Sequence, residues 1–488
     1  MELKSFFAQD PQGNMYPAAT CELLLAGTAN RASNLVDGAG KPMANPFTSH
    51  SSGLIQFAAP NGLYDLKVTA GAMSYTLRVQ CYDAKDDTGA LTNTLTQCRF
   101  GRLSPQALTQ DYTTQSITEL ESEFLSLRIG IPNIHTAAVA GVRVMVGVMD
   151  SHTAAAWLID SNPNGAGWQL CTFNGQSTAT LPAQLGEERW SVTWTDPVEL
   201  TNLPRTDGSR RPLVIVRIEF PNGAVISCPT NGLASWRSDN QVRYHKAGRQ
   251  MGVKGVSTPS SFTETLSREN ECVIPLIQYS TEKAGRQFLI VGDSTVEGVG
   301  SQPSCYGAAQ RVAHRHSTPD RPIEYFNAAI HANPPRIYAQ RVGDLMHTVR
   351  PTHVVYSPYS GNDVQPTGMT EQAQTRLKVF LGEVLRYIHL SGVHPKVTLL
   401  EGLPTTPGYK NTGANDKIRV DLNTYLQRVT GAKAAVGYAA AVSGPKLESG
   451  QIPMLANLTN DGVHPNPAGY ELLADNLEKY INLPLGMP

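Results

Sequence analysis

Hydrophobic positions fall into three successive patterns along the chain. Up to about residue 83, short apolar runs alternate with turn residues, at Cys21–Ala26, Leu54–Phe57, Tyr64–Val68 and Tyr75–Val79. The pairs Asp37-Gly38 and Asn61-Gly62 are typical of hairpin turns, because these residue types tolerate a positive φ. Residues 1–83 are therefore predicted to form a small β-sandwich, followed by a polar linker over about 83–96.

A second all-β, sandwich-like domain is predicted for residues 100–283. Strand-like runs lie at Val142–Val148, Trp168–Phe173, Trp190–Trp194 and Leu213–Phe220. In the last run, Arg217 and Glu219 alternate with apolar residues, which predicts a strand with one face in water.

All five tryptophans fall in this second region, at Trp157, Trp168, Trp190, Trp194 and Trp236. Flat aromatic rings could form a stacking platform for sugars. They could equally fill the core of a sandwich, and the ease with which large aromatic side chains are buried favours the core.

From residue 284 onward the pattern changes to strand followed by helix. Short apolar runs typical of parallel strands covered on both faces lie at Phe288–Val291, Ile323–Phe326, Val354–Tyr356 and Val397–Leu400. Apolar residues repeat at helical spacing over 377–388 and 418–429. The chain is thus expected to be multidomain, with an α/β three-layer domain over 284–488 whose reactive groups gather at the carboxyl ends of its strands.

Composition narrows the classes of function. The 40 basic and 41 acidic side chains of the 488 residues give a formal charge of −1, which argues against nucleic acid as a partner. No apolar run is long enough for membrane insertion, the nearest being Ala434–Val442. The first ten residues lack the features of a secretion signal peptide, so export by that route is not expected.

The cysteines predict neither disulfides nor a zinc ribbon. They number seven, an odd count, and none is spaced as CxxC. Reduced, buried thiols are the expected state.

One candidate for chemistry is Gly292-Asp293-Ser294, directly after the run Phe288–Val291. A serine on the turn that leaves a strand can act as a nucleophile if a base reaches it. Alone, the motif is more often an ordinary turn or helix cap. Asn362, in Ser360-Gly361-Asn362-Asp363, could donate its amide to an oxyanion, although an Asx turn is the favoured interpretation of this segment when it is taken alone.

Another candidate is Asp461-Gly462-Val463-His464. A carboxylate three residues before the imidazole can accept its Nδ1–H and so turn Nε2 toward a serine. Asn466 and Pro467 then predict a helix N-cap and first turn, which would pin this loop.

Together and in this order, the three motifs resemble the SGNH (GDSL-type) hydrolase family over about residues 284–488. The resemblance implies a flavodoxin-like α/β fold and a serine esterase that needs no cofactor or metal. It also implies roles for three residues: Ser294 as nucleophile, His464 as general base and then acid, and Asp461 as the residue that orients His464. The oxyanion hole would combine the Ser294 backbone with the Asn362 side chain.

The family's second block, usually Asn-x-Gly-x-x-Gly, corresponds here to Asn327–Ala332. The resemblance implies Ala332 as a further oxyanion-hole residue, in place of glycine. Only its backbone N–H is required, so the donor survives if the backbone accepts a methyl group, which we expect only at negative φ.

Other polar residues give weaker signals. His314 and His316 diverge on a predicted helix, so they are not expected to bind a metal. Gly298 and Gly300 lack the spacing of a dinucleotide fingerprint. Glu401, at a strand end, could line the site or simply cap the rim of the sheet.

The resemblance implies hydrolysis of an ester, and carbohydrate O-acetyl groups are the expected substrate. Many SGNH proteins resemble deacetylases, and two β-domains, one of them rich in tryptophan, precede the enzyme domain. Lipid and thioester acyl chains are less favoured, because no long apolar segment near the motifs suggests an acyl tunnel.

Residues 17–79 resemble the small β-domains that begin some bacteriophage tail and receptor-binding proteins, through the turn-rich stretches Leu35–Pro42, Asn45–Thr48 and Gly53–Tyr64. The resemblance implies a tail fibre or tailspike of the virion, made in the host cytoplasm. Such a protein would be a homotrimer that attaches to tail or baseplate proteins through residues 1–83. It would remove O-acetyl groups from bacterial surface polysaccharide.

Two alternatives remain open. One is a non-catalytic receptor-binding tail protein with a degenerate hydrolase domain. The other is an intracellular carbohydrate esterase with accessory β-modules.

Overall fold

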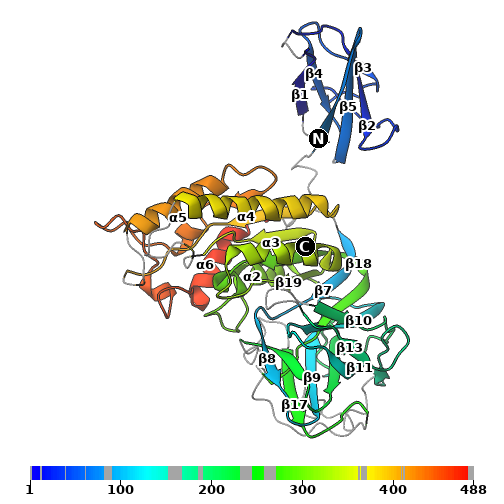
Figure 1. Cartoon of the computed structure of the whole chain (residues 1–488), viewed down its shortest axis with the longest axis vertical. Helices are drawn as coiled ribbons and strands as arrows, with labels where there is room; N and C mark the ends of the chain where they lie inside the picture. Colours follow the sequence, from blue (N-terminus) through cyan, green and yellow to red (C-terminus); the bar gives the residue numbers. More distant parts are fainter. Residues whose placement is uncertain are drawn as a thin grey trace. The chain divides into compact units, whose positions relative to one another are not determined.

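A computed structural model of the chain describes residues 3–10, 14–38, 40–60, 62–81, 91–151, 167–184, 191–230, 245–257, 271–360, 363, 371–407, 409 and 413–481. The chain divides into two compact units, Met1–Thr88 and Gly89–Pro488. Figure 1 shows the elements of both units in chain order.

The first unit is built from β1 (Leu3–Phe7), β2 (Thr20–Leu25), β3 (Phe47–Thr48), β4 (Leu54–Ala58), β5 (Gly62–Ala70) and β6 (Met73–Cys81). One sheet has the order β3-β2-β5-β6, and β1 pairs with β4. The prediction of short strands is confirmed, since the four predicted runs lie within β2, β4, β5 and β6 to within one residue, and each strand contributes side chains to one buried hydrophobic cluster.

Of the two residue pairs predicted to form hairpin turns in this unit, one lies in a turn and the other falls partly outside the described residues. Asp37-Gly38 lies in a tight turn closed by a bridge between Val36 and Pro42. Asn61 lies outside the described residues, and β5 pairs with β2 and β6 rather than with β4. The β5–β6 hairpin turns instead at Gly71, whose φ of 57° suits a two-residue hairpin turn.

The second unit begins with a β-lobe, the described residues from 91 to 280. Its strands are β7 (Thr92–Gln97), β8 (Leu103–Ala107), β9 (Tyr112–Glu119), β10 (Ser126–Asn133), β11 (Val139–Met149), β12 (Gln169–Leu170), β13 (Ala179–Leu181), β14 (Ser191–Trp194), β15 (Leu213–Phe220), β16 (Val225–Pro229) and β17 (His245–Met251). Strands β12-β11-β15-β9-β17 form one sheet, with β13 also paired to β11, and β16 pairs with β8.

Strand β18 (Leu276–Val291) joins this lobe to the rest of the unit. Its first half pairs antiparallel with β7 and β10, and its second half pairs parallel with β19 (Ile323–Asn327) and β20 (His353–Tyr356). The boundary expected at 283/284 therefore falls inside a strand. The polar linker expected over 83–96 is likewise a paired strand from Thr92 onward, because Leu95 is fully buried against β18.

The α/β-lobe comprises the described residues from 285 onward. Its parallel strands have the order β19-β18-β20-β21-β22, with β21 at Lys396–Leu400 and β22 at Lys433–Ala435. This is the 2-1-3-4-5 order of a flavodoxin-like sheet, so the α/β fold predicted for this region is confirmed. Such a sheet has a crevice at the carboxyl ends of its first and third strands, here β18 and β20.

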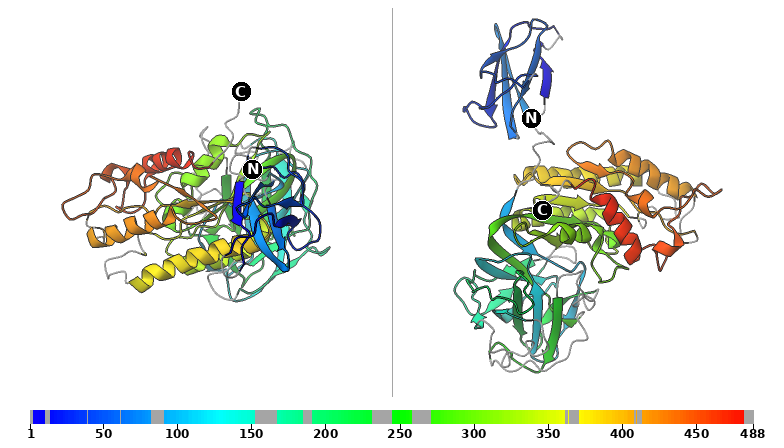
Figure 2. Two further views of the ribbon diagram at one scale, coloured as in Figure 1. Left: turned by 90° about the horizontal axis from the view of Figure 1, so that it is seen from above. Right: turned by 180° about the vertical axis from the view of Figure 1, so that it is seen from behind.

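Helices cover both faces of this sheet. They are α1 (Ser294–Glu297), α2 (Ala308–His316), α3 (Pro335–Val349), α4 (Glu371–Leu390), α5 (Gly413–Leu426) and α6 (Pro467–Leu477), with 3₁₀ turns η4 (Ala439–Val442) and η5 (Ala456–Leu458). Helix α2 packs with α6, and α3 packs with α4. Figure 2 shows α6, in red, and α4, in yellow, on opposite sides of the sheet.

Strand β15 corrects the prediction of a wet face. All eight of its residues are buried, Arg217 completely. Arg217 donates from Nε and Nη2 to Gln115 Oε1 at 2.8 and 2.6 Å, while Glu219 accepts from the N–H groups of Val256 and Ser257. The segment over 253–257 covers the face that the alternating pattern assigned to water.

A buried ionic cluster ties the β-lobe to the α/β-lobe. Arg99 is 3% exposed and lies 3.5 Å from Glu121 and 3.3 Å from Glu324. Its Nη1 lies 2.8 Å from Nε2 of His314 on α2. Because an unpaired buried charge is costly, this cluster favours joint unfolding of the lobes.

The described tryptophans of the β-lobe are half-buried. An arginine lies over each ring, Arg217 over Trp168 at 5.5 Å and Arg128 over Trp194 at 4.7 Å. The other three tryptophans lie outside the described residues. These two rings are therefore neither fully buried in a sandwich core nor fully exposed as a platform for sugars.

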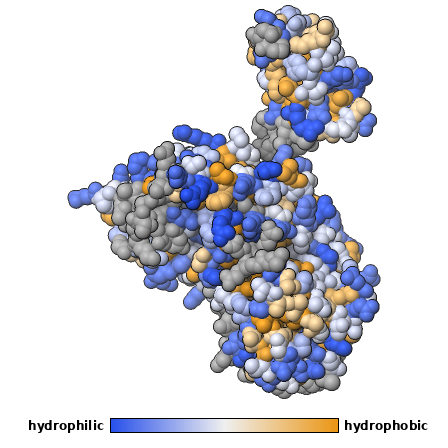
Figure 3. All heavy atoms as spheres, in the orientation of Figure 1, coloured by the Kyte–Doolittle hydropathy of each residue, from blue (hydrophilic) through white to orange (hydrophobic). Residues whose placement is uncertain are grey.

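Figure 3 shows apolar residues in small groups among hydrophilic ones on the visible face. Of the helices that the structure describes, none combines the length and the apolar character that a membrane span requires.

The shared strand predicts joint unfolding of the two lobes. Leu289 and Leu66 are both fully buried, in the α/β-lobe and in the first unit respectively. Leu289→Ala should destabilise the second unit by about 2–5 kcal/mol and so shift the urea transition of tryptophan fluorescence, although every tryptophan precedes β18. Leu66→Ala should leave that transition in place. A fluorescence transition that ignores Leu289→Ala would show that the lobes unfold separately.

Candidate active site

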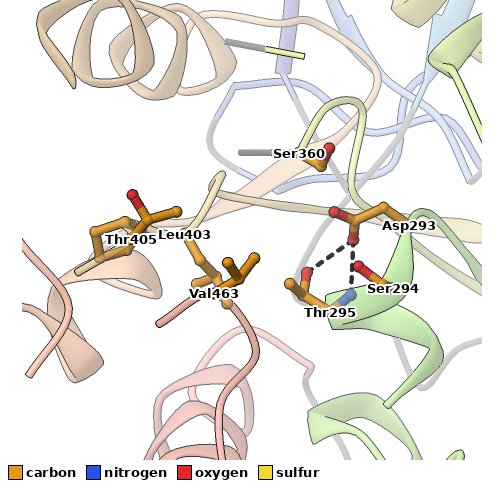
Figure 4. Close-up of a pocket in the computed structure, with 8 residues that line it drawn as sticks. Asp293, Ser294, Thr295, Ser360, Leu403, Thr405 and Val463 are labelled. Atoms are coloured by element: carbon orange, nitrogen blue, oxygen red, sulfur yellow. Dashed lines mark hydrogen bonds between the residues drawn. The ribbon is translucent and has the colours of Figure 1, made fainter. Parts of the chain in front are cut away.

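Ser294 occupies the turn between β18 and α1. Gly292 has a φ of 156°, and a Cβ there would lie 2.8 Å from Val296 Cγ2, so glycine is required. Asp293 caps α1 by accepting hydrogen bonds from Thr295 N–H at 3.1 Å and Thr295 Oγ1 at 2.7 Å (Figure 4). Ser294 is the first helical residue and is only 3% exposed.

Asp293 itself is fully enclosed. Burial raises the pKa of its carboxyl, and the hydrogen bonds from Thr295 and Val296 oppose that rise. Its contacts make it the cap of the helix that presents Ser294.

Residues 170 positions apart meet at this turn. His464 Nε2 lies 2.9 Å from Ser294 Oγ, and His464 Nδ1 lies 2.6 Å from Asp461 Oδ2. The structure therefore brings together the three residues that the sequence singled out, in the arrangement of a nucleophile, a base and an orienting carboxylate.

The loop that carries Asp461 and His464 is held by backbone contacts. Asp461 Oδ1 accepts from the N–H groups of Val463 at 2.9 Å and His464 at 2.8 Å. As predicted, α6 begins at Pro467, and Asn466 caps it by accepting from Gly469 N–H at 3.1 Å. The loop is thus fixed between its own turn and a helix start.

The electrostatics of this pair favour a charged Asp461. Partial burial raises the pKa of Asp461, but the hydrogen bonds from the ring and backbone of His464 and from Val463 outweigh it and lower the pKa to about 2. The carboxylate can therefore stabilise an imidazolium at any pH well above that value.

A small cavity adjoins Ser294. Its volume is about 10 Å³, roughly enough for one water molecule. Figure 4 shows Leu403 and Val463 across from Ser294. The lining residues are Asp293, Ser294, Thr295, Ser360, Leu403, Pro404, Thr405 and Val463.

The loop after β19 runs beside the serine turn. Ala328 N–H donates to Ile290 O at 2.8 Å, and Ile330 N–H donates to Gly292 O at 2.9 Å. Ala332 follows with a φ of 61°. The expectation that alanine would require a negative φ here is wrong. The residues on either side are held, His331 N–H by Glu297 and Asn333 O by the Tyr338 hydroxyl, and the left-handed backbone between them costs about 1–2 kcal/mol.

The segment after β20 is described only in part. Ser360 lines the cavity, and its N–H and hydroxyl donate to Asp363 Oδ2 at 2.6 and 3.1 Å. Burial raises the pKa of Asp363 to about 7, and the Asp293 carboxylate adds to the rise. Asn362 lies outside the described residues.

The residues that gave weaker signals in the sequence, His314, His316 and Glu401, make contacts within the fold. His314 is buried between the rings of Tyr306 and Tyr325, and Glu401 accepts from Ala439 N–H at 3.0 Å. His316 lies 3.5 Å from Glu478. Over the described part of the chain, no group of three or more His, Cys, Asp or Glu residues could hold a metal ion.

At two glycines near the site, backbone atoms of other segments come too close to leave room for a side chain. A Cβ at Gly298 would lie 2.5 Å from Tyr306 N, and one at Gly300 would lie 2.9 Å from Pro465 O. All seven cysteines lie among the described residues, are buried and form no disulfide.

The sequence reasoning missed Glu297, Leu403 and Thr405. Glu297 ends the helix that begins at Ser294 and is completely buried, and the other two line the cavity. A carboxylate in the third position after the serine was the only available signal for Glu297, and its partners lie far away in the sequence.

Part of this chain is similar to a known protein family. Residues 290–472 match the profile of the GDSL-like Lipase/Acylhydrolase family. This match supports a GDSL/SGNH acylhydrolase domain in that region, and the family points to a carboxylic ester hydrolase. A search of curated proteins finds no match.

Solved structures similar to this region are those of TesA, the psychrotrophic esterase EstA from Pseudoalteromonas sp. and Axe2, an acetylxylan esterase from Geobacillus stearothermophilus. TesA is 20% identical, with 40% of this chain and 98% of that chain covered and a TM-score of 0.32. EstA is 19% identical, with 40% and 99% covered and a TM-score of 0.31. Axe2 is 17% identical, with 40% and 94% covered and a TM-score of 0.30.

The left-handed backbone at Ala332 yields a stability prediction. Ala332→Gly removes strain but adds chain entropy, so the free energy of unfolding should change by less than about 1 kcal/mol. Ala332→Val should lower it by about 1–3 kcal/mol, because a β-branched residue fits poorly at positive φ. Urea unfolding measures both, with Ala468→Val on the exposed side of α6 as the control. Equal effects of the two valines would mean that Ala332 is unstrained.

Proposed function

We propose that the α/β-lobe hydrolyses small acyl esters, foremost the O-acetyl esters of carbohydrates. Ser294 is the nucleophile, His464 the general base and then acid, and Asp461 the residue that orients His464. The observation that carries the proposal is the continuous contact from Asp461 Oδ2 through the imidazole to Ser294 Oγ, at 2.6 and 2.9 Å.

In the acylation step, Ser294 Oγ attacks the carbonyl carbon while its proton passes to His464 Nε2. The charge on the carbonyl oxygen is stabilised by the N–H groups of Ser294 and Ala332 and by the Asn362 amide. Collapse of the intermediate breaks the ester bond, and His464 gives its proton to the leaving alcohol. Water, deprotonated by His464, then releases the acid and restores Ser294.

The cavity beside Ser294 supports a short acyl group. A space for about one water molecule accommodates a methyl group, and a longer acyl chain would meet Leu403 and Val463. This favours acetyl over the longer esters of lipids.

The sugar and virion parts of the proposal have separate support. The two β-regions before the enzyme domain support a carbohydrate substrate. The resemblance of residues 17–79 to phage tail domains supports a homotrimeric tail protein that acts on bacterial surface polysaccharide. That part rests on the sequence resemblance alone.

Substitution of the proposed catalytic residues tests the proposal. Ser294→Ala should lower the turnover of 4-nitrophenyl acetate by roughly 10³-fold or more, and Asp461→Asn by roughly 10²–10⁴-fold. Because the pKa of Asp461 is about 2, its ionisation should not contribute to the acid limb of the pH profile above about pH 4. If wild type and Ser294→Ala both hydrolyse 4-nitrophenyl acetate and O-acetylated glycan at the background rate, the chain is a binding protein instead.

The acyl cavity predicts a chain-length preference. Wild type should hydrolyse 4-nitrophenyl acetate with a higher kcat/KM than the butyrate or hexanoate ester. Leu403→Ala should raise the butyrate-to-acetate ratio roughly tenfold, because an added methylene in a pocket is worth about 1–3 kcal/mol. Val379→Ala, at an exposed position of α4, is the control. A ratio that Leu403→Ala leaves unchanged would remove this cavity as the acyl site.

A further inference from the structure

Glu297 connects the serine helix to two other segments. It ends α1, three residues after Ser294, and its side chain is fully buried. Its Oε2 accepts from His331 N–H at 2.6 Å and lies 2.9 Å from His331 Nδ1. Its Oε1 accepts from the N–H of Arg102, in the β-lobe, at 3.2 Å.

The β-lobe approaches this carboxylate closely. Cys98 N–H donates to Tyr325 O at 3.2 Å, and Cys98 O accepts from Asn327 N–H at 3.0 Å, so the chain runs along β19 before it reaches Gly101. A Cβ at Gly101 would lie 2.4 Å from Glu297 Cδ and 2.6 Å from Ala329 O. A side chain at position 101 would therefore push against both groups.

The loop over 328–332 is also held by hydrogen bonds from Asn327 and Arg102. Asn327 Nδ2 donates to Glu297 O at 3.2 Å, and Asn327 Oδ1 accepts from Ala329 N–H at 3.3 Å. Arg102 Nη1 donates to His331 O at 3.4 Å. Ala332, the next residue, is thus reached by a loop tied to α1 on one side and to the β-lobe on the other.

We propose that Glu297 is a positioning residue for the reaction and that Gly101 and Arg102 of the β-lobe complete the support that it gives. The inference rests on the proposed function, in which Ala332 N–H stabilises the oxyanion. It assigns the β-lobe a part in the active site itself. A displacement of about 1 Å at such a donor costs on the order of 10²-fold in rate, so this support matters for turnover.

Gly101→Ala tests the contact from the β-lobe in the full chain. We expect kcat for 4-nitrophenyl acetate to fall about 10²-fold while KM changes little, because the acyl cavity is untouched. Gly167→Ala is the matched control, since a Cβ at Gly167 meets nothing within 4 Å. Wild-type kcat in Gly101→Ala would overturn the proposal.

Glu297→Gln tests the carboxylate with little change of shape and decides the matter if Gly101→Ala does not fold. The amide cannot accept from both His331 and Arg102, so kcat should fall about tenfold or more. Glu383→Gln, at an exposed position of α4, is the matched control.

Reaction with diethyl 4-nitrophenyl phosphate distinguishes a displaced oxyanion donor from a general loss of structure. Attack of Ser294 on the phosphorus needs the oxyanion donors. In Gly101→Ala and Glu297→Gln, the rate of phosphorylation should therefore fall in parallel with kcat. The inhibition constant of acetate, a competitive inhibitor, should stay unchanged. An unchanged phosphorylation rate, or a loss of acetate affinity equal to the loss of kcat, would overturn the inference. Failure of the proposed function itself would appear separately, as equal turnover by wild type and Ser294→Ala.

Discussion

Strand β18 pairs with strands of both lobes within one eight-stranded sheet, and this double pairing fixes the position of Ser294. Its first residues align with β7 and β10, and its last residues align with β19 and β20. A slip of one residue would turn every side chain of β18 to the opposite face, so the strands of both lobes must pair with β18 in one register. The turn at Gly292, and the hydroxyl that follows it, are therefore held by contacts from both lobes.

Features that depend on short segments could be predicted from the sequence. Gly292 precedes the serine because the backbone there adopts a φ that side chains rarely accept. Asn and Pro are favoured at the N-cap and the first position of a helix, and α6 begins at Asn466 and Pro467. The alternation of strand and helix after residue 284 likewise follows from local periodicity, which is why the α/β-lobe could be anticipated. The meeting of Ser294 with His464 is implied by the resemblance of the three ordered motifs to the SGNH family.

Features set by distant partners could not be predicted in this way. Arg217 alternates with apolar residues and so predicts a wet face, yet Gln115 and the segment over 253–257 bury it. Glu297 meets Arg102, 195 positions away. The left-handed backbone of Ala332 is imposed by neighbours, since alanine itself disfavours it. In each case the energy comes from packing that no local pattern records.

The side chain of Asp461 is 52% exposed, whereas that of His464 is 20% exposed. Backbone N–H groups, rather than burial, keep this carboxylate in place. Mobile ions can therefore approach it, and at about 0.15 M salt they screen charges over roughly 8 Å. The ionic strength of the medium thus becomes one of the quantities that set how strongly the Asp461 carboxylate attracts a nearby positive charge.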